Sequence, residues 1–493
     1  MPRVLLGMAG AILPLLALAA PAEARPDAPV TGELPPFFDD GDLVERYDAP
    51  AGLVRIHYTR AGRHAVASAD VDEDGVPDVV ALAGATVEEA WQYYTETLGF
   101  RAPLDDMDGG GDGRFDVYLL RFELGADGAF RREGCGDDGC WGYAVLEADF
   151  RRRRYPSVEA GLRVVGSHEL FHAVQAAYPV TLGVNESEGT ATWATESFDG
   201  SLGDFEAAVN GYLERPDRSL DQEPTGPIDS FSYGTALFFR FLEEQHPEAP
   251  LVRDLLENPG PAGWLTRLDQ RLAARDLPSF ATSFDTFARW NLSTGYRAGS
   301  EGYGNAGAYP ELTVREVELP FEDDAVRVFR ASTRYYRAPV PAGAPPLRVE
   351  LVGDDDTLEP LTLIAAVEDA ASGALRVTTG PGAEGLDLLP RSTDVFAYAA
   401  IAHGATEGGS QRPAVCFGVR SDVAECAARL GPPDMGAPDM GVGDAGPPDM
   451  GAGAATGDGG GCRSAARPGA MASPLLALVV LSCRRRRRGA VNY

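Results

Sequence analysis

The chain has 493 residues, a length that is too great for one compact core and predicts two domains with additional segments. Hydrophobic residues make up 44% of the sequence and aromatic residues 9%, so the chain can bury a large core and is not intrinsically disordered. The formal net charge of −31 at pH 7 excludes a nucleic-acid partner, because the phosphate backbone would be repelled.

The first 24 residues have the features of a signal peptide. The positive residue Arg3 precedes an apolar run, and Ala22-Glu23-Ala24 has the small-residue spacing of a cleavage site. Residues 25–49 are rich in proline and alanine and are expected to form an irregular lead-in. We therefore predict export to an oxidising compartment, where cysteines can pair.

Residues 50–308 are expected to form one α+β domain with strands early and helices later. Alternating apolar and polar residues predict a strand at 54–58, and a second strand is expected at 115–119. The spacing of apolar residues predicts helices at 86–98, 158–178, 189–198, 233–245, 251–257 and 279–291.

An acidic loop early in this domain has the pattern of a calcium site. Its carboxylates follow D-x-D-x-D-G-x-x-D, the first nine positions of a calcium-binding loop, at Asp70, Asp72, Asp74 and Asp78. The twelfth position holds Ala81 instead of the glutamate of an EF-hand, so a partial calcium loop is expected. Residues 105–113 are a second candidate. The alternative for both is a solvated turn in an acidic protein.

Four cysteines are spaced for two local disulfides. Cys135 and Cys140 are five residues apart around a Gly/Asp turn, and Cys416 and Cys426 are ten apart. A metal site at the first pair is the alternative, but residues 136–139 supply no second pair of ligands. We therefore predict the disulfides Cys135–Cys140 and Cys416–Cys426.

The most specific motif is His168-Glu169-Leu170-Phe171-His172, which matches H-E-x-x-H. Positions i and i+4 of a helix lie on one face, so both imidazoles can reach a single zinc ion. Glu169 is then placed to take a proton from a water molecule whose pKa the metal has lowered. The alternative is a structural histidine pair on a buried helix.

The third ligand decides the kind of zinc site. Residues 173–178 lack the further histidine of a metzincin, so a glutamate on a second helix is expected. Glu188 stands in Glu188-Gly189-Thr190-Ala191-Thr192-Trp193, which resembles the E-G-x-A-x-[WY] segment of glutamate-ligated zinc peptidases. The resemblance implies a zincin-like domain with Glu188 as the third ligand, on a helix whose small residues let it pack against the H-E-x-x-H helix. Glu186 is the rival ligand, and Glu196, about two turns further on, is a candidate supporting residue.

A later segment extends the same resemblance. Tyr233-Gly234-Thr235-Ala236-Leu237 is similar to the tyrosine-glycine segment that follows the metal site in several such peptidases. The similarity implies that Tyr233 hydrogen-bonds the oxyanion of the tetrahedral intermediate. The alternative is a half-buried tyrosine that packs on the core.

Residues 309–430 are expected to form a small all-β sandwich, because short apolar runs alternate with Gly, Pro and Asp turns. Strands are predicted at 326–329, 347–351, 361–366, 375–378 and 395–401. Residues 431–461 repeat Pro-Asp-Met-Gly and are expected to be a flexible linker.

In the final segment, 462–493, a cysteine precedes a short apolar stretch and five arginines. This layout resembles the C-terminal sorting tag of myxobacterial surface proteins, which implies processing and attachment at the outer membrane. An ordinary membrane anchor that is retained is the alternative.

Together these segments resemble a family of secreted myxobacterial zinc metalloproteases with the same tail. The resemblance implies a secreted, surface-attached endopeptidase that uses zinc to hydrolyse extracellular proteins or peptides, with calcium as a candidate second ion. The rival interpretation is a non-enzymatic adhesin or matrix protein with a structural or degenerate zinc site. A zinc hydrolase that acts on another kind of bond is a third interpretation.

Overall fold

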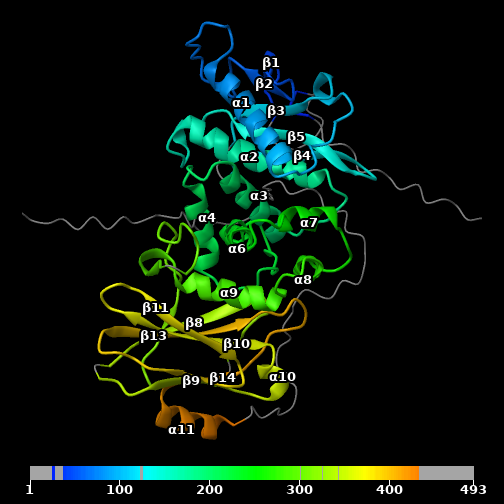
Figure 1. Cartoon of the computed structure of the whole chain (residues 1–493). Coiled ribbons are helices and arrows are strands. Elements are labelled where there is room, and N and C mark those ends of the chain that lie inside the picture. Colours follow the sequence, from blue (N-terminus) through cyan, green and yellow to red (C-terminus); the bar gives the residue numbers. More distant parts are fainter. Residues whose placement is uncertain are drawn as a thin grey trace, which may run out of the picture. The chain divides into compact units, whose positions relative to one another are not determined.

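The computed structural model describes residues 25–27, 37–122, 126–299, 301–324, 326–341 and 343–431. The signal peptide, the final segment and all but the first residue of the linker lie outside the described residues. In the described part of the chain, helices are combined with three sheets, so the protein is of mixed α and β structure (Figure 1). No helix among these residues is long and apolar enough to cross a membrane.

The first sheet is mixed and has the strand order β1-β2-β3-β5-β4. Its strands are β1 (Val44–Asp48), β2 (Val54–Thr59), β3 (Phe115–Leu120), β4 (Gly128–Gly136) and β5 (Gly139–Glu147). The three central strands run parallel, and β1 and β4 are antiparallel to their neighbours. β1 lies in the expected irregular lead-in, where it pairs with β2 over its full length as an edge strand of the sheet.

Helices α1 (Asp78–Gln92) and α2 (Val158–Ala176) pack on this sheet and against each other (Figure 1). α1 continues as the π-helical turn η1 (Tyr93–Thr97) and begins eight residues before the predicted start. Pro77 at its N-cap and an aspartate in its first turn explain this early start, because both suit a helix N-terminus. α2 begins at the predicted residue, 158, and the Ser157 hydroxyl caps it by accepting a hydrogen bond from the amide of Ala160.

The other helices of this region are α3 (Val184–Phe198), α4 (Asp204–Leu213), α5 (Ser230–Gly234), α6 (Ala236–Gln245), α7 (Leu251–Glu257), α8 (Trp264–Ala274) and α9 (Phe280–Leu292). Short 3-10 turns lie at η2 (Gly109–Gly111), η3 (Phe150–Arg152) and η4 (Gly295–Arg297). The helix predicted at 233–245 is divided at Thr235, whose hydroxyl donates to the Asn185 carbonyl. The sequence patterns did not predict α4 and α8.

The C-terminal region contains two more sheets, with strand orders β11-β10-β13-β8-β6 and β12-β9-β14-β7. Their strands are β6 (Arg315–Glu316), β7 (Phe321–Asp323), β8 (Ser332–Pro339), β9 (Leu347–Val352), β10 (Leu361–Asp369), β11 (Leu375–Pro381), β12 (Leu386–Leu388), β13 (Asp394–His403) and β14 (Ala414–Val419). The two sheets share one apolar core, to which Val349, Leu363, Ile401 and Phe417 belong. The strand expected at 326–329 is reduced to a single bridge between Val328 and Gln411.

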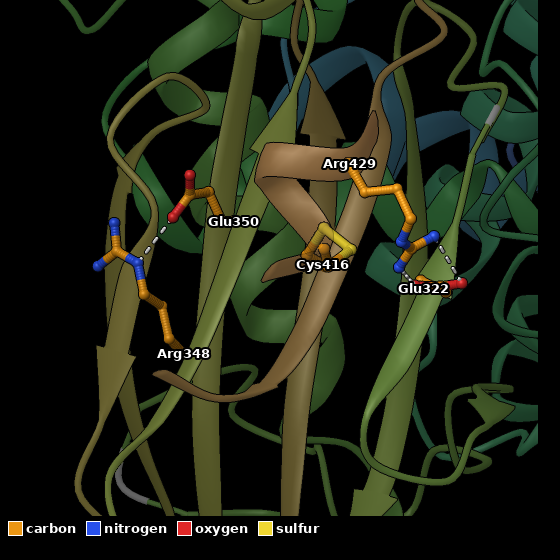
Figure 2. Close-up of a disulfide and its surroundings, with 6 residues drawn as sticks. Glu322, Arg348, Glu350, Cys416 and Arg429 are labelled. Carbon is orange, nitrogen blue, oxygen red and sulfur yellow. Dashed lines mark hydrogen bonds and ion pairs between the residues drawn. A yellow bond between two sulfur atoms is a disulfide. The ribbon is translucent and has the colours of Figure 1, made fainter. Parts of the chain in front are cut away.

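Both predicted disulfides are confirmed. Cys135–Cys140 joins β4 to β5, and Cys416–Cys426 joins β14 to α11 (Arg420–Leu430), the last described helix. Figure 2 shows the second disulfide beneath α11, whose Arg429 pairs with Glu322 of β7. A short helix, α10 (Asp355–Leu358), precedes β10.

The helical region and the β-rich region are joined by a shared core. Tyr335, Ile364 and Tyr398 belong to the same apolar cluster as the helices. At this junction the Tyr335 hydroxyl donates to the Ala288 carbonyl at 2.8 Å. The predicted domain boundary between residues 308 and 309 therefore falls within a continuous apolar interface and stays a prediction.

Candidate metal centre

Two helices bring the predicted zinc ligands together. α2 places His168 and His172 one turn apart, and α3 supplies Glu188. One ligand atom from each of the three lies within 4.8 Å of the other two. The Nε2 atoms of the histidines are 3.1 Å apart, and Oε2 of Glu188 lies 3.1 Å from His168 Nε2 and 3.6 Å from His172 Nε2.

These distances and donor types fit a zinc ion. Zinc binds nitrogen and oxygen ligands at about 2.0–2.1 Å with tetrahedral angles, so two of its ligand atoms are about 3.3 Å apart. The three measured separations bracket that value. Burial raises the pKa of Glu188, but His172 and His168 outweigh it and lower this pKa to about 2. The carboxylate is therefore charged and suited to hold a cation.

A second layer of hydrogen bonds fixes the His172 ring. Its Nδ1 lies 2.8 Å from Oε1 of Gln175, and the Gln175 amide group donates to the Ser187 carbonyl and to the Thr190 hydroxyl, both at 2.8 Å. Because the amide nitrogen is engaged, Oε1 must accept, so Nδ1 of His172 carries the proton. Nε2 is then the nitrogen that can give up its proton and bind a metal, as in other metal-ligating histidines.

Glu169 lies beside the group on the buried side of α2. Its side chain is buried, and its Oε2 accepts a hydrogen bond from the backbone N–H of Phe130 in β4 at 2.7 Å. Burial raises the pKa of Glu169, while His172 and His168 partly offset this effect. The close approach of β4 requires a glycine, because a Cβ on Gly128 would clash with Val165 and come within 3.0 Å of Glu169 Oε1.

Glu186 and Glu196, the other glutamates considered for this site, lie outside the metal group. Glu186 pairs with Arg267 of α8 at 2.7 Å, and both side chains are buried. Burial raises the pKa of Glu186 to about 7 despite the opposing charge of Arg267. Glu196 lies two turns beyond Glu188 and is not part of the metal group. The structure thus brings Glu188, rather than Glu186 or Glu196, to the histidines.

Tyr233 is close to the metal group without belonging to it. Its ring centroid lies 5.9 Å from that of His168, and both residues line one cavity.

Gly189, the glycine of the E-G-T-A-T-W segment, has a different neighbour from the one expected. A Cβ on Gly189 would first meet Thr235 and Phe239, so its small size lets α3 approach α6 rather than α2.

The group opens into a cavity of about 530 Å³. His168, Glu169 and Tyr233 contribute to its wall, together with residues of α3, α4 and the segments at 126–128 and 153–155. A cavity of this size, with convergent polar groups at one wall, is typical of a substrate site.

The sequence matches no protein-family model, and a search of curated proteins found no similar sequence. The likeness to glutamate-ligated zinc peptidases therefore rests on the H-E-x-x-H and E-G-T-A-T-W segments.

Three of the four predicted calcium ligands lie together: Asp70, Asp72 and Asp78. The fourth, Asp74, is outside the group, and its Oδ1 accepts a hydrogen bond from Val76 N instead. The same aspartates also hold the turn, because Asp70 accepts from Gly75 N and Asp78 from Val71 N, both at 3.0 Å. The geometry is compatible with a partial calcium loop and with a solvated turn.

The second candidate calcium loop, 105–113, has no such group within the described residues. Arginines form ion pairs with two of its carboxylates, those of Asp106 and Asp112. Asp106 pairs with the half-buried Arg25, and Asp112 pairs with Arg55 at 2.7 Å and with the neighbouring Arg114. Arg25 and Arg55 come from distant positions in the chain, so the sequence pattern did not predict their pairing with this loop.

Proposed function

We propose that the chain is a secreted zinc-dependent endopeptidase with a zincin-like catalytic domain and a C-terminal β-sandwich. His168, His172 and Glu188 would bind the zinc ion, and Glu169 would act as the general base. The observation that supports this most is the convergence of three zinc-type donor atoms, one of them on His168 in the wall of a large cavity, with the buried carboxylate of Glu169 beside them. A structural zinc site needs neither the cavity nor the base.

Glu169 and Tyr233 would have different roles in the hydrolysis of the peptide bond. Zinc, when bound, supplies a Lewis acid that polarises a carbonyl and lowers the pKa of water. Glu169 accepts the proton of the attacking water and passes it to the leaving amine. Oε1 is the oxygen for this role, because Phe130 N–H engages Oε2. Tyr233 hydrogen-bonds the oxygen of the substrate carbonyl as negative charge develops on it.

The raised pKa of Glu169 suits this task. A base that accepts a proton and later donates it works best when its pKa lies nearer to neutrality than that of an exposed glutamate. Burial of the side chain produces that shift. Gln175 contributes by keeping the His172 tautomer that can bind the metal.

We further propose that the protein acts outside the cell on proteins or peptides and is held at the outer surface by its final segment, 462–493. The two disulfides support the extracellular location, because such bonds persist in oxidising compartments. A calcium ion at Asp70, Asp72 and Asp78 would stabilise the loop that precedes α1.

The proposal is tested by measuring metal content and cleavage on the full chain. We expect about one zinc per chain, cleavage of casein, loss of cleavage with a chelator, and recovery on addition of zinc. Bound zinc without cleavage of casein or of any member of a peptide library would instead favour the adhesin. Cleavage of an ester or amide library but not of peptides would favour a different zinc hydrolase.

A further inference from the structure

The carboxylates of the cavity wall differ in how their charges are balanced. Apart from Glu169, four of them line the cavity. Three are paired with arginines: Asp127 with Arg153 at 3.2 Å, Asp199 with Arg163 at 2.6 Å, and Asp204 with Arg154 at 3.3 Å. The fourth is Glu196, and among the described residues no arginine lies within ion-pair distance of it. The cavity therefore contains one acidic group without a cation.

The surroundings of Glu196 are unfavourable for a negative charge. The residue is half-buried in the last turn of α3, where the free carbonyls of the helix add negative potential. Glu206 of α4, Glu243 of α6 and Asp199 face it with like charges, and Tyr309 also lies near. A positive ligand would relieve this repulsion.

Arg240, whose charge lowers the pKa of Glu196, forms ion pairs with other carboxylates. Arg240 of α6 pairs with Glu243 at 2.9 Å and with Glu244 at 2.7 Å. Burial and the charge of Glu206 prevail over it and raise the pKa of Glu196 to about 7. In the absence of a ligand, the carboxyl group is thus partly protonated at neutral pH.

We propose that Glu196 is a specificity-determining residue that binds a positively charged side chain, arginine or lysine, of a peptide in the cavity. This inference rests on the proposed function, because it assumes that the cavity holds a peptide. It assigns to the proposed endopeptidase a preference for basic substrates. The net charge of −31 supports the same preference, because it attracts cationic peptides.

The helix fixes how far the basic residue lies from the bond that is cut. Glu196 follows Glu188 by eight residues on α3, which is about 12 Å along the axis at 1.5 Å per residue. An extended peptide covers about 3.3 Å per residue. The basic residue is therefore expected within about four positions of the scissile bond.

Binding is tested on the full, zinc-loaded chain carrying Glu169→Gln, so that peptides are not cut. The probes are peptide pairs with arginine or its neutral analogue citrulline at each of four positions on either side of a central peptide bond. We expect arginine to bind about tenfold more tightly at one position or more. At pH 7, calorimetry in two buffers should show proton release with arginine and none with citrulline.

Two substitutions assign the preference to Glu196. Glu196→Gln should reduce the arginine-to-citrulline ratio to less than about twofold and abolish the proton release. Glu257→Gln removes the same charge from an exposed site on α7, outside the cavity, and should keep both. If Glu196→Gln does not fold, the peptide pairs and the proton release on the chain with Glu196 intact still decide the question.

Equal binding of arginine and citrulline at every position would overturn the inference, as would a preference that persists in Glu196→Gln. Cleavage is scored separately with the wild-type chain. Preferred binding of arginine without any cleavage would support the cation site and remove the peptidase proposal. Cleavage without the preference would keep the peptidase and overturn the role of Glu196.

Discussion

Gln175 offers the sharpest test of how the metal centre is held. Its side chain contacts His172, Ser187 and Thr190, and so joins the helix of the histidines to the helix of the glutamate ligand. We expect Gln175→Ala to weaken zinc binding, because the proton on His172 Nδ1 loses its acceptor. Outer-shell partners of this kind typically change metal affinity by about 10–100-fold, or about 1.4–2.7 kcal/mol.

The substitution should also destabilise the metal-free chain. Besides its contact with His172, the Gln175 side chain makes three hydrogen bonds at 2.8–2.9 Å. Its amide group donates to the Ser187 carbonyl and to the Thr190 hydroxyl, and its Oε1 accepts from the Ser187 hydroxyl. At about 1 kcal/mol for each of these three, the expected loss is about 3 kcal/mol. Gln175→Glu keeps an acceptor for His172 but no donors, so it should retain zinc affinity better than stability.

Zinc affinity is measured by competition with a chromophoric chelator, and stability by urea unfolding of the metal-free chain. Gln270→Ala, at an exposed position of α8, is the matched control and should change neither quantity. Wild-type zinc affinity in Gln175→Ala would refute the argument that this residue sets the His172 tautomer.

The remaining predictions concern four other positions of the structure. Glu188→Gln should lose the zinc. Glu186→Gln should keep the zinc and lose about 3–5 kcal/mol of stability in urea, because its buried partner Arg267 is left uncompensated. Zinc loss in Glu186→Gln would reverse this ligand assignment. Gly128→Val should reduce kcat on casein with zinc retained, since the added side chain displaces the general base, and unchanged kcat would contradict this. Calcium should raise the Tm of the wild type but not of Asp70→Asn, and an equal rise in both would rule out that site.

The local features of the chain could be predicted well from its sequence. The spacing of His168 and His172 is a property of one helix, and the two disulfides each close a short loop. Helix α7 was predicted with its observed bounds, because its apolar periodicity ends at a polar turn. These predictions need only interactions between residues close in sequence.

Features that depend on distant partners could not be predicted in this way. Glu186 and Glu188 are both acidic residues in the first turns of α3, and only the position of Arg267, some 80 residues later, separates their roles. The same holds for the acidic stretch at 105–113, which Arg25 and Arg55 neutralise. The supporting role of Gln175 had a sequence signal, its place one turn after His172, but its partners lie on α3.

Strands were missed where their pattern was not simple. β8 and β14 are buried at most positions, so they lack the alternation that marks a strand with one exposed face. The apolar residues at 326–329 do alternate, but only two backbone N–H groups, those of Val326 and Val328, donate to the segment at 411–413, and only Val328 forms a β-bridge. Pairing with neighbouring strands therefore decided which apolar segments became strands.

The central claim is that Glu169 is the base of a zinc peptidase. The most direct measurement is kcat/KM for casein peptides with the zinc-loaded wild type and with Glu169→Gln, each checked for zinc content. We expect the variant to keep its zinc and to lose about 10²–10⁴-fold in kcat/KM, because the metal ligands are intact and only the base is removed. Undiminished cleavage by a zinc-loaded Glu169→Gln chain would contradict this claim.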